Sequence, residues 1–207
     1  FFMEKEQYEE DYYECIDKVD TQCRKLVHQM REELGDDRLR ISFDEWNVWY
    51  AWYRAKSVND GIFTASMLHM LIEEAGPSGI DMACHFEAVN EGAIRVEWEH
   101  AFLTPSGKMF SVMKNHIGGK IRFAVKDAIM TEKDGICTVT LINRSYSDDK
   151  KFVLMQCGAP VAATLFSSED VLPHSDFEVT DVKLNAVNDT IDVQLPKHSV
   201  MLLRFKR

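Results

Sequence analysis

Apolar residues recur at steps of three and four near the start of the chain, and this period predicts an amphipathic helix over about residues 5–34. Gly35 is expected to end that helix. A second helix is expected to open with Asn59 or Asp60 as its N-cap and to run to Ala75. Because this second segment is apolar on nearly all sides, we expect the helix to be mostly buried.

Between these helices, residues 39–43 alternate apolar and polar side chains as a strand does. Alternation assigns the residues at the end of this strand to two faces, with Ile41, Phe43 and Glu45 on one and Ser42 and Asp44 on the other. A second strand is predicted over residues 80–89 and a short helix around residues 108–115. Helices that alternate with strands imply that the two strands run parallel.

After residue 118 the apolar period changes from helical to two, which favours β-structure to the end of the chain. About seven strands with turn signals between them predict an antiparallel β-sandwich. They are expected at residues 121–125, 136–142, 151–155, 161–166, 177–184, 190–195 and 199–205. We therefore predict an α/β domain over residues 1–118 and an all-β domain over residues 119–207.

Charge and composition narrow the classes of partner. A net charge of -10 argues against nucleic acid and against an anionic membrane surface, since both would repel the chain. No segment reaches the roughly 18 to 20 apolar residues that a membrane span needs. Five cysteines without a CxxC pair fit a reduced, cytoplasmic setting. No GxGxxG, GxSxG or P-loop pattern is present, and no cofactor or metal is expected.

The candidate chemistry lies where the first strand ends, at the adjacent carboxylates of Asp44 and Glu45. A crowd of aromatic rings follows them: Trp46, Trp49, Tyr50, Trp52 and Tyr53. Carboxylates beside aromatic rings suit glycoside hydrolysis, which usually needs one carboxyl group to protonate the leaving oxygen and another to attack or to activate water. In a βα-barrel such groups lie at the C-terminal ends of strands. We assign the nucleophile to Glu45 and a supporting role to Asp44, the alternative being that the pair only caps the following turn.

The string ISFDEWNVWY at residues 41–50 resembles the nucleophile segment of the family 51 glycoside hydrolases, the α-L-arabinofuranosidases. The resemblance continues weakly at residues 59–61, 83–90, 141–144 and 195–200. It implies the C-terminal part of a (β/α)8 barrel, with strands seven and eight, followed by a β-sandwich of jelly-roll type. It also implies Glu45 as the nucleophile of a retaining enzyme that takes part in arabinan degradation, and a homo-oligomeric assembly.

The same resemblance suggests residues that bind the sugar: Trp46, Asn47, Trp49, Glu87 and Trp98. Glu87 stands where family members typically carry a Gln on strand eight, so it could accept hydrogen bonds from sugar hydroxyls but could not donate them. Its alternative role is an ion pair with Arg95 or a lysine. Trp98 lines the sugar pocket in one interpretation and covers the barrel rim in the other.

The family's acid/base Glu lies on strand four, which would precede Phe1. We therefore expect this chain to supply one carboxylate of the pair and to be inactive alone. Residues 1–118 are expected to need the remainder of the barrel or another copy of the chain, because two parallel strands leave their edges unpaired. The expected substrate is an arabinose-containing oligosaccharide or polysaccharide. Two alternatives remain open: a non-catalytic carbohydrate-binding or assembly module, and another retaining glycosidase such as a xylosidase or endoglucanase.

Overall fold

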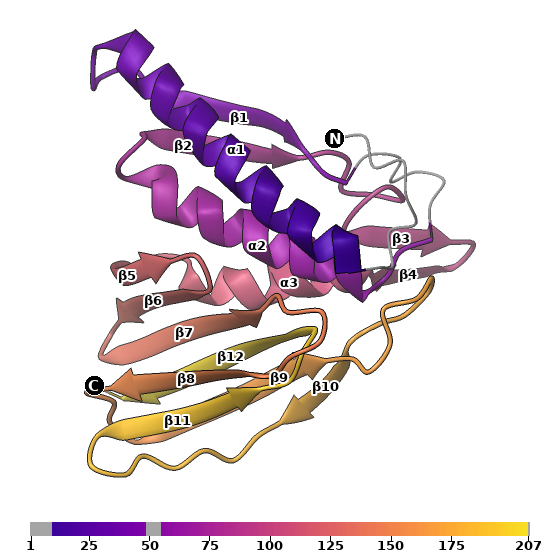
Figure 1. The fold of residues 1–207 in the computed structure, drawn as a ribbon, viewed down its shortest axis with the longest axis vertical. Coiled ribbons are helices and arrows are strands. Elements are labelled where there is room, and N and C mark those ends of the chain that lie inside the picture. The colour runs from indigo at the N-terminus through magenta and orange to yellow at the C-terminus, as the bar shows by residue number, and fades with distance from the viewer. Residues whose placement is uncertain (1–9, 49–54, 207) are drawn as a thin grey trace.

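The computed structural model describes residues 10–48 and 55–206, with side chains from Tyr13 onward (Figure 1). The helices are α1 (Glu10–Leu34), α2 (Val58–Ala75), α3 (Pro105–Met113) and a 3-10 turn (Lys114–His116). The strands are β1 (Ile41–Trp46), β2 (Ile80–His85), β3 (Ile94–Glu97), β4 (His100–Leu103), β5 (Lys120–Val125), β6 (Ala128–Lys133), β7 (Ile136–Asn143), β8 (Lys150–Met155), β9 (Pro160–Ser167), β10 (Glu178–Asp181), β11 (Thr190–Leu195) and β12 (Ser199–Lys206).

The two long helices confirm the predicted helical segments, with one correction at the start of α2. Its N-cap is Ser57, which has an extended backbone, and neither Asn59 nor Asp60 takes that place. The Asp60 carboxylate instead accepts a hydrogen bond from the backbone N–H of Ser57 at 2.8 Å, as the third residue of a capping box does. Asn59 accepts one from the Tyr13 hydroxyl at 2.6 Å and so ties α2 to α1. As predicted, α2 is buried along most of its length.

Strands β1 and β2 pair in parallel, as the alternation of helices and strands predicts. They form a separate two-stranded sheet among the described residues. The pairing is irregular between Phe43 and Trp46, so the register shifts before the strand ends. Strand β2 is shorter than the predicted segment 80–89, and only Ile80 of its six residues is buried.

The C-terminal strands form a six-stranded antiparallel sheet in the order β10-β9-β12-β7-β6-β5, and β8 pairs with β11 in a second sheet. Apolar residues from both sheets, such as Leu141 and Leu203 of the larger and Ile191 and Val193 of the smaller, form one buried cluster. This arrangement confirms a change to antiparallel β-structure after residue 118. The seven predicted strands correspond to β5 and to β7 through β12. Strand β6 is not predicted, because its sequence has no strong strand signal.

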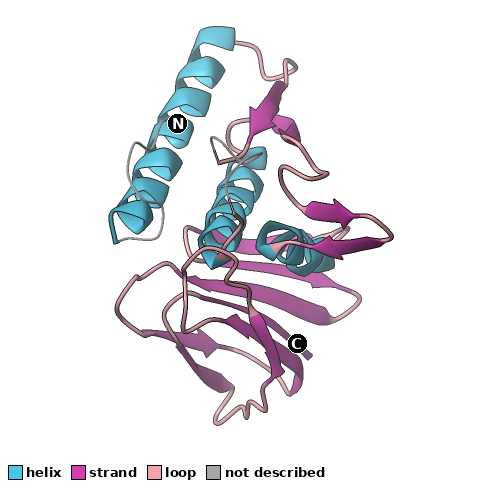
Figure 2. Cartoon of the chain, turned by 90° about the vertical axis from the view of Figure 1, so that its right-hand side faces the viewer, coloured by secondary structure: helices cyan, strands magenta, loops and turns pink. Residues whose placement is uncertain are grey.

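Helix α2 lies between the β1–β2 pair and the six-stranded sheet (Figure 2). A single apolar cluster joins Ile62 of α2 with Ile80 of β2, Ile142 of β7 and Val200 of β12. Phe177, which precedes β10, belongs to the same cluster. The helices and the large sheet therefore share one core.

Strands β3 and β4 form a hairpin that the sequence analysis does not predict. All of its residues are exposed except Ile94, which is half-buried. In Figure 1 the hairpin lies at the side of the molecule toward which both β1 and β2 point. The end of β1 that carries Glu45 therefore lies on the same side of the fold as this hairpin.

Candidate site at the ends of strands β1 and β2

The Glu45 carboxylate belongs to an exposed residue one position before the end of β1. Asp44 is also exposed, and the alternation that predicts opposite faces for the two residues does not separate them by burial. The register shift between Phe43 and Trp46 explains this difference, because a shift interrupts the strict alternation of side chains. The supporting contact of Asp44 is with its own strand: the Ser42 hydroxyl donates a hydrogen bond to its carboxylate.

Trp46 is a core residue in this structure, although it is predicted to bind the sugar. Its side chain is 6% exposed, and its ring packs against His85 at 4.8 Å and Phe110 at 5.9 Å between ring centroids. The register shift again accounts for the difference, since it turns Trp46 toward the helices. The indole Nε1 is buried and has no hydrogen-bond partner among the described residues.

His85 is the partner of Trp46 across the parallel pair. Burial and the nearby Lys56 ammonium lower the pKa of His85 to about 4, so the ring is neutral at pH 7. Neither ring nitrogen has a hydrogen-bond partner in the described part of the chain. A side chain at Gly92 would collide with this ring, so the loop after β2 packs directly over His85.

Asn47 holds the loop that follows β2, and its predicted contact with sugar stays a prediction. Its amide group donates to the carbonyl oxygen of Phe86 and, at 3.2 Å, to that of Glu91. Its side-chain oxygen accepts from the backbone N–H of Val48 at 2.7 Å. Because donor and acceptor are both engaged with backbone, Asn47 positions the end of β1 against the loop beyond β2.

Glu87 is exposed just after β2, beside the end of β1 that carries Glu45. The alternative of an ion pair with Arg95 is not observed, since the Arg95 guanidinium lies 3.0 Å from the Glu97 carboxylate. Glu87 therefore stands at the same strand ends as Glu45, and its role in sugar binding stays a prediction.

Trp98 lies at the turn of the β3–β4 hairpin with positive φ and full exposure. It covers no other described residue, so these residues give no support to the interpretation that it covers the barrel rim. Trp49 and the following rings Tyr50, Trp52 and Tyr53 lie outside the described residues.

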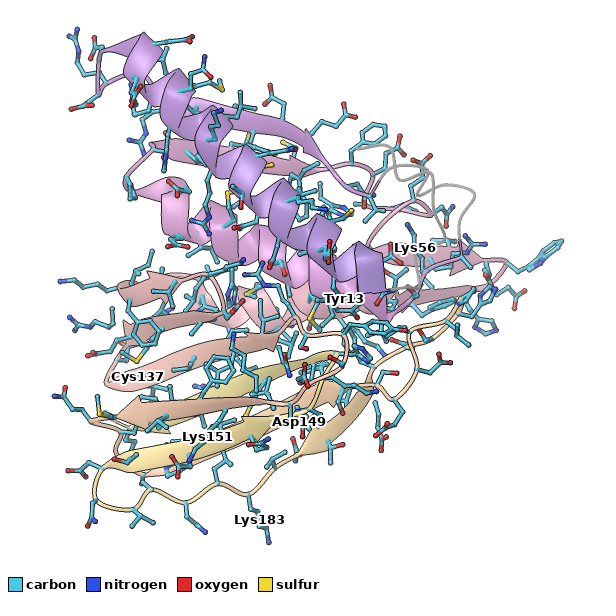
Figure 3. All side chains as sticks on the ribbon, viewed as in Figure 1. Tyr13, Lys56, Cys137, Asp149, Lys151 and Lys183 are labelled. Atoms are coloured by element: carbon cyan, nitrogen blue, oxygen red, sulfur yellow. The ribbon has the colours of Figure 1, made fainter. Side chains whose placement is uncertain are left out.

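The structure adds a cavity of about 420 Å³ that the sequence does not indicate. It lies between the β3–β4 hairpin, the start of α3, the residues before α2 and the loop between β9 and β10. Its lining includes Lys56, Arg95, Phe102, His174 and Asp176. These residues are far apart in sequence and share no motif, so only the fold brings them together. Figure 3 shows Lys56 on the side of the molecule that carries the hairpin.

No group of three or more His, Cys, Asp or Glu side chains in residues 10–48 and 55–206 is arranged to hold a metal ion. Over the same residues, no helix has the length and apolar character needed to cross a membrane. Cys15, Cys23, Cys84 and Cys157 form no disulfide bond among the described residues.

No protein-family model matches the sequence, and no curated protein matches it significantly. Solved structures do match. The family GH51 arabinofuranosidase from Xanthomonas axonopodis pv. citri superposes with a TM-score of 0.75 at 17% identity, over 91% of this chain and 45% of that one. The α-L-arabinofuranosidase from Thermotoga maritima gives a TM-score of 0.72 at 18% identity, over 93% of this chain and 48% of that one.

A more distant likeness is to CelM2, a bifunctional glucanase-xylanase from a metagenome library, with a TM-score of 0.59 and 18% identity. It covers 88% of this chain and 34% of CelM2. The chain thus spans less than half the length of each of these three proteins. At such identities the likeness establishes a shared fold: the chain has the mixed helix and strand architecture found in part of the GH51 arabinofuranosidases.

Proposed function

We propose that this chain carries the nucleophile of a retaining glycoside hydrolase that releases terminal α-L-arabinofuranosyl residues from arabinose-containing polysaccharides or oligosaccharides. The observation that carries the proposal is the exposed Glu45 carboxylate at the C-terminal end of a parallel strand pair. Barrel enzymes place catalytic groups at such strand ends. The resemblance of residues 41–50 to the nucleophile segment of the arabinofuranosidases supports the choice of Glu45, and the fold shared with GH51 arabinofuranosidases supports the class of enzyme.

In the proposed reaction, a Glu45 carboxylate oxygen attacks the anomeric carbon as the glycosidic C–O bond breaks. A second carboxyl group gives its proton to the departing oxygen, which leaves as an alcohol. Water then attacks the anomeric carbon of the glycosyl ester and returns its proton to the second carboxylate. The sugar leaves with its configuration retained, and the Glu45 carboxylate is restored. Retention places the two carboxyl groups roughly 5 Å apart.

The second carboxyl group is proposed to come from barrel segments that this chain does not span, since the arabinofuranosidases it resembles are about twice as long. Without a proton donor, the chain alone should be slower by roughly 10²- to 10⁴-fold and effectively inactive. Glu87, exposed beside Glu45, is proposed to accept hydrogen bonds from sugar hydroxyls, and Trp98 to lie along the path of a longer substrate.

The exposed apolar side chains of β2 support the proposal that another polypeptide segment packs on the β1–β2 pair. Met82 is 54% exposed in the middle of β2, and Phe86 just beyond it is 45% exposed. Apolar side chains on an unpaired two-stranded sheet are a surface that another part of a barrel would cover. We propose that the remaining barrel segments cover it, with another copy of the chain as the alternative occupant and a homo-oligomer as the assembly.

The likeness to CelM2 favours one second candidate, a retaining glycosidase that acts on xylan or glucan. Such an enzyme would use Glu45 in the same way and would differ in the groups that hold the sugar. The two candidate functions therefore differ in the sugar that the enzyme hydrolyses, and they share the same nucleophile.

The test uses the gene product that contains this chain, assayed with aryl α-L-arabinofuranosides and aryl β-D-xylosides. Glu45→Gln should lower kcat by at least about 10³-fold, because it removes a group that acts in the transition state. Asp44→Asn is the matched control and should lose much less. In Glu45→Gly, added azide should restore turnover and give a glycosyl azide of inverted configuration. Turnover that survives Glu45→Gln would reject the nucleophile, and turnover of xylosides alone would favour the second candidate.

A further inference from the structure

The cavity beside the β3–β4 hairpin is built by segments that the fold holds firmly together. The backbone N–H of His174, in the loop between β9 and β10, donates to the carbonyl oxygen of Lys56 at 2.8 Å. The Ser175 hydroxyl accepts from the backbone N–H of Val58 at 3.1 Å. Figure 1 shows this loop reaching up to β4. The loop therefore forms a fixed wall opposite the hairpin.

The hairpin gives the cavity one face of mixed character. Arg95 of β3 is directly opposite Phe102 of β4, so their side chains lie on the same face. Glu97, two residues along β3, shares that face and accepts from the Arg95 guanidinium at 3.0 Å. Phe102 is 50% exposed. An accessible aromatic ring beside a held guanidinium and carboxylate offers a stacking surface next to donors and acceptors.

The charged residues that line the cavity are two cations, Lys56 and Arg95, and two anions, Glu97 and Asp176. Besides the Arg95–Glu97 pair, the Asp176 carboxylate lies 2.7 Å from the Lys108 ammonium. The Lys56 ammonium donates to the Glu91 carbonyl oxygen at 2.5 Å. A cavity without an excess of either charge favours a neutral ligand that both donates and accepts hydrogen bonds over a phosphate or a cation. Its volume of about 420 Å³ lies within the roughly 300–1,000 Å³ of small-molecule sites.

A single carbonyl oxygen connects this cavity with the end of β1. The Glu91 oxygen that accepts from Lys56 at 2.5 Å also accepts from the Asn47 amide at 3.2 Å. Asn47 is two residues beyond Glu45. The cavity therefore lies next to the strand end that carries the proposed nucleophile, separated from it by the loop after β2.

We propose that this cavity binds neutral sugar residues of the substrate chain, next to the arabinofuranosyl unit that Glu45 attacks. One ring would stack on Phe102, while its hydroxyls would bond with Arg95 and Glu97. The identity of the sugar rests on the proposed function, but binding in the cavity does not require catalysis. Binding energy from such a remote site is used to hold the reacting sugar in place.

The test measures binding of linear arabino-oligosaccharides to the purified 207-residue chain by titration calorimetry, with malto-oligosaccharides as the comparison. Phe102→Ala should weaken binding by roughly three- to tenfold, the range expected for one aromatic stacking contact. Val96→Ala is the matched control, because Val96 is 44% exposed on the other face of the same hairpin and should bind as the parent does. Circular dichroism verifies that both variants are folded.

Glu45→Gln is included to separate this inference from the proposed function. If Glu45 is not the nucleophile but the cavity binds sugar, Glu45→Gln and the parent should bind alike and Phe102→Ala should still lose affinity. Absence of oligosaccharide binding by the parent chain would overturn the proposal. So would equal loss in Phe102→Ala and Val96→Ala. Equal binding of malto-oligosaccharides would overturn the assignment to arabinose.

Discussion

The hydroxyl of Thr140 lies 2.6 Å from Nε2 of the buried His116 ring, and the hydroxyl of Thr131 lies 2.9 Å from its Nδ1. Burial lowers the pKa of His116 to about 4, against about 6.5 in an unfolded chain. As pH falls, His116 therefore binds a proton at a higher pH in the unfolded chain than in the folded one. The stability that His116 contributes is complete above about pH 6.5 and is lost as pH falls toward 4. We expect the contribution of His116 to the fall in the free energy of unfolding, measured in urea over that window, to be roughly 3 kcal/mol.

The variant His116→Gln should reduce this pH dependence, because it removes the group that titrates. Some dependence should remain, since burial lowers the pKa of His69 to about 3 and acts in the same direction. The control is His100→Gln, at an exposed position in β4. An unchanged pH profile in His116→Gln would show that the ring does not contribute.

Asp127 is predicted to stabilise the fold as a partly buried ion pair. Its carboxylate accepts from the Arg144 guanidinium at 2.7 Å and from the Lys150 ammonium at 2.5 Å. Burial raises the pKa of Asp127, but Arg144 and Lys150 outweigh burial and hold the pKa below its usual value. Its contribution is therefore present above about pH 4 and is lost as pH falls through the lowered pKa.

Asp127→Asn should lower the free energy of unfolding at pH 7 by about 1–3 kcal/mol, and the cost should shrink at pH 3. The control Asp192→Asn disrupts an exposed pair with Lys151 at 3.5 Å and should cost less than about 1 kcal/mol. Chemical denaturation at both pH values compares the two. Equal costs for the two variants at pH 7 would contradict the prediction.

Asn47 is predicted to hold the loop after β2 through its amide donors. Asn47→Ala should cost about 1–2 kcal/mol, because it leaves the carbonyl oxygens of Phe86 and Glu91 without this donor. Asn47→Asp should cost more, since it points a carboxylate at two carbonyl oxygens. Thermal unfolding ranks the variants, and hydrogen exchange should be faster in the loop from Phe86 to Gly92 in both. A more stable Asp variant than Ala variant would reject this role.

Gly107 permits the close approach of α3 to the backbone of Ala93. An added Cβ would collide with the Ala93 carbonyl oxygen, which cannot move aside as a flexible side chain can. Gly107→Ala should therefore destabilise the protein by about 1–3 kcal/mol, although alanine favours helices. Gly76→Ala is the matched control, because Gly76 has φ of -75° and no atom within 4 Å of the added Cβ. It should be neutral or stabilising by up to about 1 kcal/mol in a thermal melt.

Local periodicity predicts α1, α2, the strand that carries Glu45 and most of the C-terminal strands. It fails where tertiary contacts decide the outcome. The β3–β4 hairpin turns at Trp98 with positive φ, a conformation that sequence signals for turns assign to Gly, Asn or Asp. Strand β6 is missed because Ala128–Lys133 mixes small, flexible and charged residues, and the large sheet holds it between β5 and β7.

The candidate site is predictable only in part. A motif places Glu45 at a strand end, and the structure places it there. Motif reading cannot anticipate a register shift, so it assigns Trp46 to the sugar while the structure buries it. The cavity joins Lys56, Phe102 and His174 from three separate segments, and no local pattern marks such a set.

The packing of helix α2 bears on whether the all-β part of the chain can be separated from the helical part. Its residue Ile62 belongs to the same core as Ile142 and Val200 of the large sheet. A recombination event or a protease cut near residues 118–119 would separate the α/β part from the all-β part. It would also expose the apolar side chains of the core that the two parts share. The all-β part should therefore be inherited, expressed and lost together with its helices, rather than exchanged between proteins as an independent module.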